Sequence, residues 1–420
     1  MESYAAVRRR PPQVTVAVGP GPYVEDVLAA LAAQGVLHRV IRSWPEFTVD
    51  GYDTITGRWR RLFALPLYAH LVRIVWAAWR RLPRLRRYRT PQTLLFAIFD
   101  RLAARQLGHP DLLLGWSQVS LHSMRAARRR GAVTALEHPM LHVAAWQETM
   151  VEEYARFAPD AREYYSLFPR ALVRRMLTEY EEADYVVVPS TVARDSFANR
   201  GFPLNRIVEV PFGVEVGFFV VPGKQPGARF RVAFVGRLEL LKGVHYLLDA
   251  WQALALDDAT LTCVGPVLPE IRGVLHRRAN AGNVEILGHL PRNRVRDVLA
   301  ESHVVVFPSL CDAFGLVILE AMASGRPVIA TSRSGGPDII EDGIDGFVVP
   351  PRDPAALAER LAWLFERREE CAEMGRRARL KIEAKYSLAH YGERLLGAYS
   401  GMTEPRTTRD PDTSVWDVKA

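Results

Sequence analysis

Short apolar segments alternate with longer amphipathic ones along almost the whole 420-residue chain. In the first half, apolar runs predict strands at 13–19, 112–115, 132–136, 185–188 and 207–210. Helical periodicity follows at 24–34 and 121–130 and after Ser190, and residues 149–182 are helical in composition. This alternation is typical of parallel sheets covered by helices.

The second half repeats the same alternation after a segment rich in glycine and proline. Its apolar runs predict strands at 231–235, 260–264, 284–287, 304–307 and 328–330. The chain is long enough to bury two cores of ordinary size. We therefore expect an α/β protein with two doubly wound, Rossmann-like domains that face each other across a cleft.

The domain limits follow from these changes in composition. The expected divisions are an N-terminal domain at 1–212 with an arginine-rich insertion at 54–99, a linker at 213–229, a C-terminal domain at 230–385, a helix at 386–402 that crosses back to the first domain, and a polar tail at 403–420.

The formal net charge of +8 is concentrated in the insertion. No acidic residue occurs between Asp53 and Asp100, and arginines are interleaved with apolar residues over 58–89. A membrane-spanning helix is not expected there, because Arg73 alone would cost about 2.5–3.5 kcal/mol. Two readings stay open: a helix lying in an anionic membrane surface, or a helix packed on its own domain with its arginines in water.

The cysteines and the motifs that the sequence lacks bear on the location of the protein in the cell and on its partners. Cys263, Cys311 and Cys371 form no CxxC pair, and the N-terminal residues lack the apolar core of an export signal. We therefore expect a cytoplasmic protein that is either free or peripheral on the inner face of the membrane. No zinc-finger, RNP-like or helix-turn-helix pattern accompanies the charge, so no nucleic-acid partner is expected.

Polar residues directly after predicted strands are the candidates for chemistry, because open α/β sheets bind ligands at the carboxyl ends of their strands. Gly236 and Arg237 end one strand, and Lys242 precedes the next helix. Arginine and lysine at one strand end suit a diphosphate, although ordinary surface cations would have the same spacing.

A second cluster surrounds the start of a later helix. Asp312 precedes a helix that begins near Phe314, and its first amides, those of Phe314, Gly315 and Leu316, can bind a phosphate. Glu320 follows in an apolar run, where a carboxylate needs a partner. That partner is either a ribose or a buried arginine.

A third cluster lies in the first domain. Glu137 and His138 follow a predicted strand, which directs His138 toward the crevice between the domains. The alternative for His138 is an ordinary polar contact at a strand end.

Together these clusters resemble the retaining glycosyltransferases of family 4, which have the GT-B fold. The segments that carry the resemblance are FVGRLELLKG, FPSLCDAFGLVILEAMASGRPVIA and SGGPDIIEDGIDGFVVPPRDPAALA. The resemblance implies that Arg237 and Lys242 bind a donor diphosphate together with the three amides, and that Glu320 binds the ribose. Asp312 stands where the family has the first glutamate of Glu-x7-Glu.

The same resemblance assigns His138 to the donor sugar and the pair His289 and Leu290 to the nucleotide base, and Gly19 and Gly21 to a phosphate loop. It implies a nucleotide-sugar donor of UDP, GDP or ADP type, transfer with retention, and neither a metal nor another cofactor. The acceptor is unknown, and the arginines at 58–89 favour a lipid-linked or otherwise anionic one.

Four other functions compete with this interpretation. An epimerase or a phosphorylase can share the two-domain layout. A dinucleotide-dependent oxidoreductase would need a glycine where Val24 stands. An inactive nucleotide-sugar-binding or membrane-docked scaffold is suggested by Asp312 and by the arginine-rich insertion.

Overall fold

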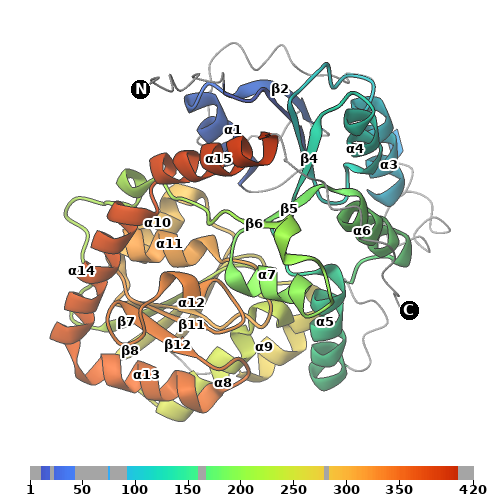
Figure 1. Ribbon diagram of the computed structural model, residues 1–420. Helices are drawn as coiled ribbons and strands as arrows, with labels where there is room; N and C mark the ends of the chain where they lie inside the picture. Colours follow the sequence, from blue (N-terminus) through green and yellow to red (C-terminus); the bar gives the residue numbers. More distant parts are fainter. Residues whose placement is uncertain are drawn as a thin grey trace, which may run out of the picture.

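The computed structural model describes residues 11–18, 23–42, 74–75, 92–158, 167–278 and 283–404. Within these ranges the chain forms two parallel six-stranded sheets with helices packed against them (Figure 1). The expectation of an α/β protein with two Rossmann-like domains is therefore confirmed.

The N-terminal sheet has the strand order β2-β1-β3-β4-β5-β6. Its strands are β1 (Val14–Val18), β2 (Leu37–Arg42), β3 (Leu112–Trp116), β4 (Val133–Glu137), β5 (Tyr185–Val188) and β6 (Ile207–Glu209). Its helices are α1 (Val24–Ala33), α3 (Gln92–Ala103), α4 (Leu121–Arg128), α5 (Val143–Phe157), α6 (Arg170–Glu182) and α7 (Thr191–Ala198). Strands β1 and β3 are buried at every position, as expected for strands covered on both faces.

The C-terminal sheet has the order β12-β11-β10-β7-β8-β9. Its strands are β7 (Phe230–Val235), β8 (Ala259–Val264), β9 (Val284–Gly288), β10 (Val304–Phe307), β11 (Val328–Thr331) and β12 (Gly346–Val349). Its helices are α8 (Val244–Leu254), α9 (Arg272–Arg278), α10 (Arg292–Glu301), α11 (Leu316–Ala323), α12 (Gly336–Ile339), α13 (Pro354–Glu366) and α14 (Arg368–Lys385). Short 3-10 turns, η4 (Val216–Phe219) and η5 (Leu240–Lys242), flank β7.

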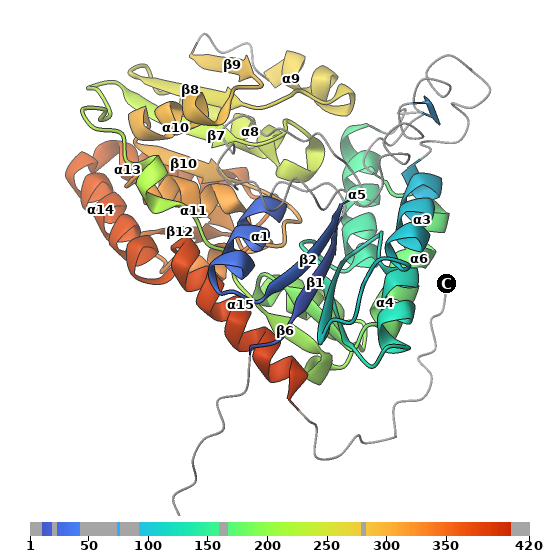
Figure 2. The ribbon, with the colours of Figure 1, turned by 90° about the horizontal axis from the view of Figure 1, so that it is seen from above.

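The last helix, α15 (Leu388–Thr403), leaves the C-terminal domain and packs against α1 of the first (Figure 2). Gly392 allows this approach, because a Cβ atom there would lie 3.1 Å from Nε2 of Gln34. Arg394 of α15 donates hydrogen bonds of 3.0 and 3.1 Å to the carbonyl oxygen of Pro211. Helix α15 thus joins the end of the chain to the linker and to the first domain.

Helix α5 makes the principal polar contacts from the first domain to the second. Glu153 is fully buried and forms an ion pair with Arg352, which follows β12 and adopts a left-handed backbone with φ of 62°. Tyr246 of α8 donates a 3.2 Å hydrogen bond to the same carboxylate. The next residue, Tyr154, donates a 2.6 Å hydrogen bond to Glu270. These contacts hold the two domains face to face.

Of the arginine-rich segment at 58–89, only residues 74 and 75 belong to the described ranges, so the helix expected there lies outside them. Most of the polar tail, 405–420, lies outside them as well. In the part of the chain that the structure covers, no helix is both long and apolar enough to cross a bilayer.

Glu153 gives a direct test of the domain contact. We expect Glu153→Ala to lower the free energy of unfolding by about 2 kcal/mol, because it leaves Nε of Arg352 and the Tyr246 hydroxyl without this buried acceptor. Urea unfolding followed by fluorescence measures the change.

The neighbouring Glu152→Ala is the matched control, since Glu152 also pairs with Arg352 but its side chain is 57% exposed. Its effect should stay below about 1 kcal/mol. Equal losses in the two variants would contradict a special role for the buried carboxylate.

Candidate functional site

The loop after β7 is shaped by a close approach of two backbones. A Cβ atom on Gly265, at the end of β8, would lie 1.9 Å from the carbonyl oxygen of Gly236. Gly265 also has a φ of 141°, which side chains rarely adopt. The close packing of these strand ends fixes the direction in which the chain leaves β7, and Arg237 is the next residue.

Two cations at this strand end surround a buried carboxylate. Glu239 is fully buried, and one of its oxygens accepts a 2.9 Å contact from Arg237, whose side chain is 58% exposed. Burial raises the pKa of Glu239, and the nearby Arg237 and Lys242 oppose that rise. The second Glu239 oxygen has no hydrogen-bond partner among the described residues. Glu239 therefore holds Arg237 at the mouth of the site and was not expected from the sequence.

Lys242 connects β7 to the loop after β10. Its ammonium group forms an ion pair with Asp312 and lies 5.3 Å from the centre of the Phe307 ring. The other Asp312 oxygen accepts a 3.2 Å hydrogen bond from the backbone amide of Phe314. The structure therefore brings together three residues that the sequence placed in two separate clusters.

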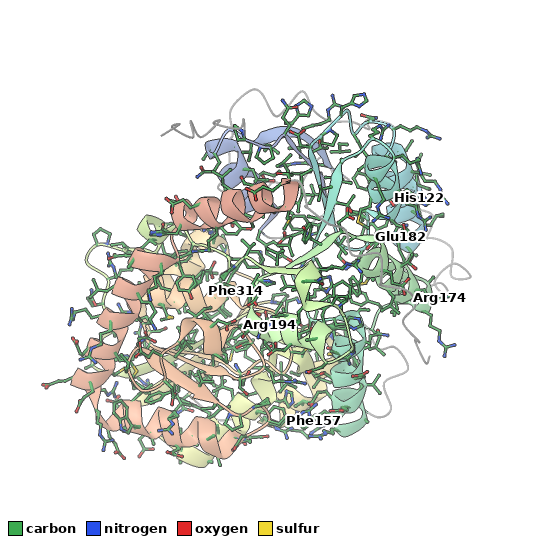
Figure 3. All side chains as sticks on the ribbon, in the orientation of Figure 1. His122, Phe157, Arg174, Glu182, Arg194 and Phe314 are labelled. Atoms are coloured by element: carbon green, nitrogen blue, oxygen red, sulfur yellow. The ribbon has the colours of Figure 1, made fainter. Side chains whose placement is uncertain are left out.

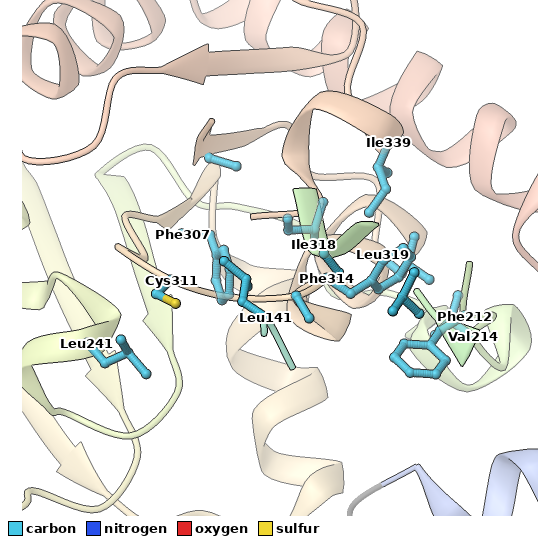
Figure 4. Close-up of a cluster of buried hydrophobic side chains, with 14 of the residues drawn as sticks. Leu141, Phe212, Val214, Leu241, Phe307, Cys311, Phe314, Ile318, Leu319 and Ile339 are labelled. Carbon is cyan, nitrogen blue, oxygen red and sulfur yellow. The ribbon is translucent and has the colours of Figure 1, made fainter. Parts of the chain in front are cut away.

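Helix α11 begins beside this ion pair, within the apolar cluster of Figure 4. Gly315 precedes the helix with φ of 85°, and a Cβ atom there would lie 2.6 Å from the Phe307 ring. Within the described chain, the amides of Gly315 and Leu316 have no acceptor. The start of α11 thus presents unpaired N–H groups and the positive end of the helix dipole next to Lys242.

Glu320 lies one turn further along α11 and faces charges from both domains. Burial raises its pKa to about 7; Arg292 of α10 opposes the rise, and Asp26 of α1 adds to it. The Glu320 carboxylate has no hydrogen-bond partner among the described residues. Arg292 lies 3.6 Å from Glu215, in the linker. The expected alternative, an ion pair of Glu320 with a buried arginine, is not formed among the residues that the structure describes.

His138 does not lie where its position after β4 suggested. Its ring is fully buried against Tyr180 and Phe197 of the first domain, with centroid distances of 5.0 and 5.3 Å. Nε2 lies 3.0 Å from the carbonyl oxygen of Leu141, and Nδ1 has no described partner. Burial lowers the pKa of His138 to about 4. The expectation that His138 projects into the crevice therefore differs from the structure.

Glu137 precedes His138, and its side chain points to the opposite face of the sheet. Its side chain is 2% exposed, and burial raises its pKa to about 8. Three tyrosines, Tyr23, Tyr391 and Tyr399, lie near enough for Glu137 to raise their pKa values further, after burial itself. Tyr23 is also influenced by Asp312, so it lies between carboxyl groups of the two domains. Successive residues at a strand end point to opposite faces, which separates Glu137 from His138.

The remaining predicted residues are less informative. His289 is exposed and Leu290 half-buried, directly after β9. Gly19 and Gly21 lie outside the described ranges. The described side chains contain no group of three His, Cys, Asp or Glu residues arranged to hold a metal ion.

A cavity of about 410 Å³ opens between the domains. Helices α5 and α7 line one wall, and the loops after β10, β11 and β12 line the other. Leu310 and Arg333 of the second wall flank Asp312, whose amide donates a 3.0 Å hydrogen bond to the carbonyl oxygen of Arg333. The crevice thus reaches the loop that carries the Lys242–Asp312 pair.

The architecture agrees with solved structures over nearly the whole chain. The Anabaena protein HepE in complex with UDP has a TM-score of 0.61 at 16% identity, covering 93% of this chain and 100% of that one. Sucrose-phosphate synthase from Thermosynechococcus elongatus has a TM-score of 0.64 at 18% identity, covering 93% and 99%. Fold and site together define a two-domain GT-B protein.

Sequence comparison gives the family. Residues 229–367 match the model of the family "Glycosyl transferases group 1". The D-inositol 3-phosphate glycosyltransferase of Geodermatophilus obscurus is 30% identical over 332 residues, which cover 73% of this chain and 70% of that one. The chain therefore belongs to the group 1 glycosyltransferases.

Other relatives match over shorter lengths. The alpha-D-kanosaminyltransferase of Streptomyces kanamyceticus is 32% identical over 172 residues, which span 40% of this chain and 45% of that enzyme. This relative therefore matches the chain over less than half of its own length.

Because Glu137 is buried, we expect the stability of the folded protein to fall as the pH rises. Because its pKa is about 8 in the folded protein and near 4.5 in a free side chain, the folded state binds the extra proton between these values. Stability should then fall as the pH rises from about 4.5 to about 8. Glu137→Gln should remove this loss and raise stability at pH 8.5 by at most about 5 kcal/mol.

Urea unfolding of both proteins at pH 5.5 and 8.5 measures this difference. Glu369→Gln, at an exposed carboxyl group on α14, is the control and should leave the pH dependence unchanged. A Glu137→Gln protein that loses as much stability as the parent between these pH values would contradict the burial argument.

Proposed function

We propose that the chain transfers a sugar from a nucleoside-diphosphate donor to an acceptor hydroxyl, with retention of configuration and without a metal ion. The observation that carries the proposal is the convergence of Lys242, the Asp312 carboxylate and the unpaired amides at the start of α11. A diphosphate bound there would receive charge-assisted hydrogen bonds from a cation and from a helix N-terminus.

The proposal gives each part of the cluster a role in the departure of the nucleotide. Arg237 and Lys242 bind the diphosphate and stabilise the charge that develops as the sugar–phosphate bond breaks. Lys242 then exchanges part of its contact with Asp312 for the phosphate. The released Asp312 oxygen accepts hydrogen bonds from hydroxyl groups of the donor sugar.

Glu320 is suited to the ribose, because its carboxylate is largely removed from water and is unpaired among the described residues. Hydrogen bonds from two ribose hydroxyls would favour its charged form and lower its raised pKa. His289 and Leu290, directly after β9, lie at the edge where the nucleotide base would follow. UDP, bound by Anabaena HepE, is the first donor nucleotide to test.

Two residues are assigned differently from the sequence-based expectation. The proposal gives His138 no contact with the donor in this arrangement, because its ring is enclosed by the first domain. Tyr23 is assigned to the crevice instead, because Glu137 of the first domain and Asp312 of the second both influence it. The acceptor hydroxyl enters from this side, and a lipid-linked or anionic acceptor on the inner membrane face stays part of the proposal.

Donor binding is the first test of the proposal. Lys242→Ala should weaken binding of the accepted nucleotide sugar about thirtyfold, corresponding to the loss of a charged hydrogen bond of about 2 kcal/mol. Glu320→Ala should weaken it about tenfold through lost ribose contacts. Titration calorimetry with UDP-, GDP- and ADP-sugars measures both changes.

Lys224→Ala and Glu359→Ala remove the same side chains at exposed positions and should leave affinity unchanged. If none of the three donor classes binds the parent protein, the proposed donor site is excluded.

Turnover separates the transferase from an inactive scaffold of the same fold. Asp312→Asn should lower kcat about a hundredfold, because its interaction with the donor sugar strengthens as the bond breaks, while donor affinity changes little. Asp257→Asn, at an exposed carboxylate, is the control.

Nucleotide release across a panel of hydroxyl acceptors gives the rate, and NMR of the product gives the anomeric configuration. Donor binding without turnover on any acceptor would favour the scaffold. An inverted product would exclude retention.

A further inference from the structure

A strongly basic groove lies on the first domain, outside the site described above. It runs between α3 and α4, has a volume of about 450 Å³, and is lined by eight residues. These are Arg101, Ala104, Arg105, His122, Arg125, Ala126, Arg129 and Arg130. Five arginines and a histidine, with no carboxylate among them, give the groove a concentrated positive charge.

Helical spacing explains why these side chains meet. His122, Arg125, Ala126 and Arg129 recur at intervals of three and four residues, so they share one face of α4 and of the turn that follows it. Arg101 and Arg105 have the same spacing at the end of α3. The small residues Ala104 and Ala126 form the floor, which leaves a hollow between the cationic walls.

The side chains of three of the five arginines make neither an ion pair nor a hydrogen bond with a described residue. Arg125 pairs with Glu182, and Arg130 donates a 3.2 Å hydrogen bond to the carbonyl oxygen of Ala104. Arg101, Arg105 and Arg129 are exposed and make no ion pair with a described residue. Burial lowers the pKa of His122, and Arg101 is among the cations that lower it further.

A buried polar network keeps the groove rigid. Asp100 is fully buried and accepts hydrogen bonds of 2.6 and 2.8 Å from the amides of His122 and Ser123 at the start of α4. Its carboxylate also pairs with Arg175 of α6. The two helices that form the groove are therefore joined by a charged hydrogen-bond network rather than by apolar contacts alone.

An exposed apolar side chain lies on the same face as the cations. Leu94 of α3 is 59% exposed and precedes Arg101 by seven residues, or two helical turns. A soluble polyanion has no apolar group that could contact this leucine. An anionic lipid surface offers both phosphate groups to the arginines and an apolar boundary to the leucine.

We propose that the α3–α4 groove binds an anionic membrane surface, with Arg101, Arg105 and Arg129 on lipid phosphates and Leu94 at the headgroup boundary. In the view of Figure 3, His122 and Glu182, which mark this side of the domain, lie well away from Phe314 at the start of α11. Binding there leaves the crevice uncovered. The α3–α4 groove shares no residue with the proposed donor site.

Vesicle sedimentation tests the inference with the full chain. The protein should bind vesicles of phosphatidylcholine that contain roughly a third phosphatidylglycerol. It should bind vesicles of phosphatidylcholine alone much more weakly. The triple variant Arg101→Gln, Arg105→Gln, Arg129→Gln should reduce partitioning about a hundredfold, because each cation near an anionic leaflet contributes roughly a fivefold increase. Leu94→Ser should reduce it as well.

Matched controls carry the same changes on the other domain. Arg272→Gln, Arg277→Gln, Arg376→Gln has the same net charge as the triple variant, and Leu380→Ser replaces a leucine that is 51% exposed. Both controls should bind vesicles like the parent protein. Circular dichroism and the midpoint of thermal unfolding establish that each variant is folded.

Three results would overturn the inference. The parent protein could fail to bind anionic vesicles. The triple variant could bind them as well as its control, which would assign the affinity to arginines elsewhere, including those at 58–89. Finally, inorganic phosphate could bind in an arginine-dependent way while vesicles do not, which would make the groove a site for free phosphate.

Discussion

The parallel direction of the strands is the constraint on which the rest of the structure depends. In each sheet every strand ends at the same edge, so residues far apart in sequence meet there. Lys242 after β7 and Asp312 after β10 form an ion pair across 70 positions of the chain for this reason. The two edges face each other because Glu153 and α15 connect the domains.

At the edge of the C-terminal sheet, each cation forms an ion pair with a carboxylate, and an anionic ligand could take the place of that carboxylate. Arg237 pairs with Glu239, and Lys242 pairs with Asp312, so each cation has an anion of the protein beside it. A buried cation without a partner would cost more than a buried pair. In the proposed reaction, a diphosphate would replace part of each pair and leave Asp312 free for hydrogen bonds. The same contacts therefore stabilise the unliganded loop and prepare it for an anion.

The sequence predicted every strand of the two sheets except β2 and β12, which both lie at a sheet edge. β2 escaped prediction because its sequence, LHRVIR, mixes charged and apolar residues, as an edge strand partly open to water allows. β12 has only four residues and begins with a glycine. Residues 149–182, interpreted as one helical stretch, contain the end of α5 and the whole of α6.

Site prediction depended on motif spacing, which locates a residue but not the direction of its side chain. Spacing brought Asp312 and Phe314 to one loop, where the structure places them together. Spacing could not predict which face of the sheet Glu137 and His138 each point to, because side chains one position apart along a strand point to opposite faces. Glu239 was also not predicted as a site residue, because in the sequence a carboxylate between two cations looks like an ordinary surface residue.

The buried network under the α3–α4 groove also reaches the carboxyl end of β3. Glu179 of α6 accepts hydrogen bonds of 2.6 and 3.0 Å from the amides of Gln118 and Ser120, in the loop after β3, and it contacts Arg175 at 3.2 Å. Arg175 in turn pairs with Asp100 beneath the groove. Burial raises the pKa of Glu179 to about 7, and Arg175 is the main opposing influence. This network therefore joins α3, α6 and the loop that leads into α4 beneath the groove.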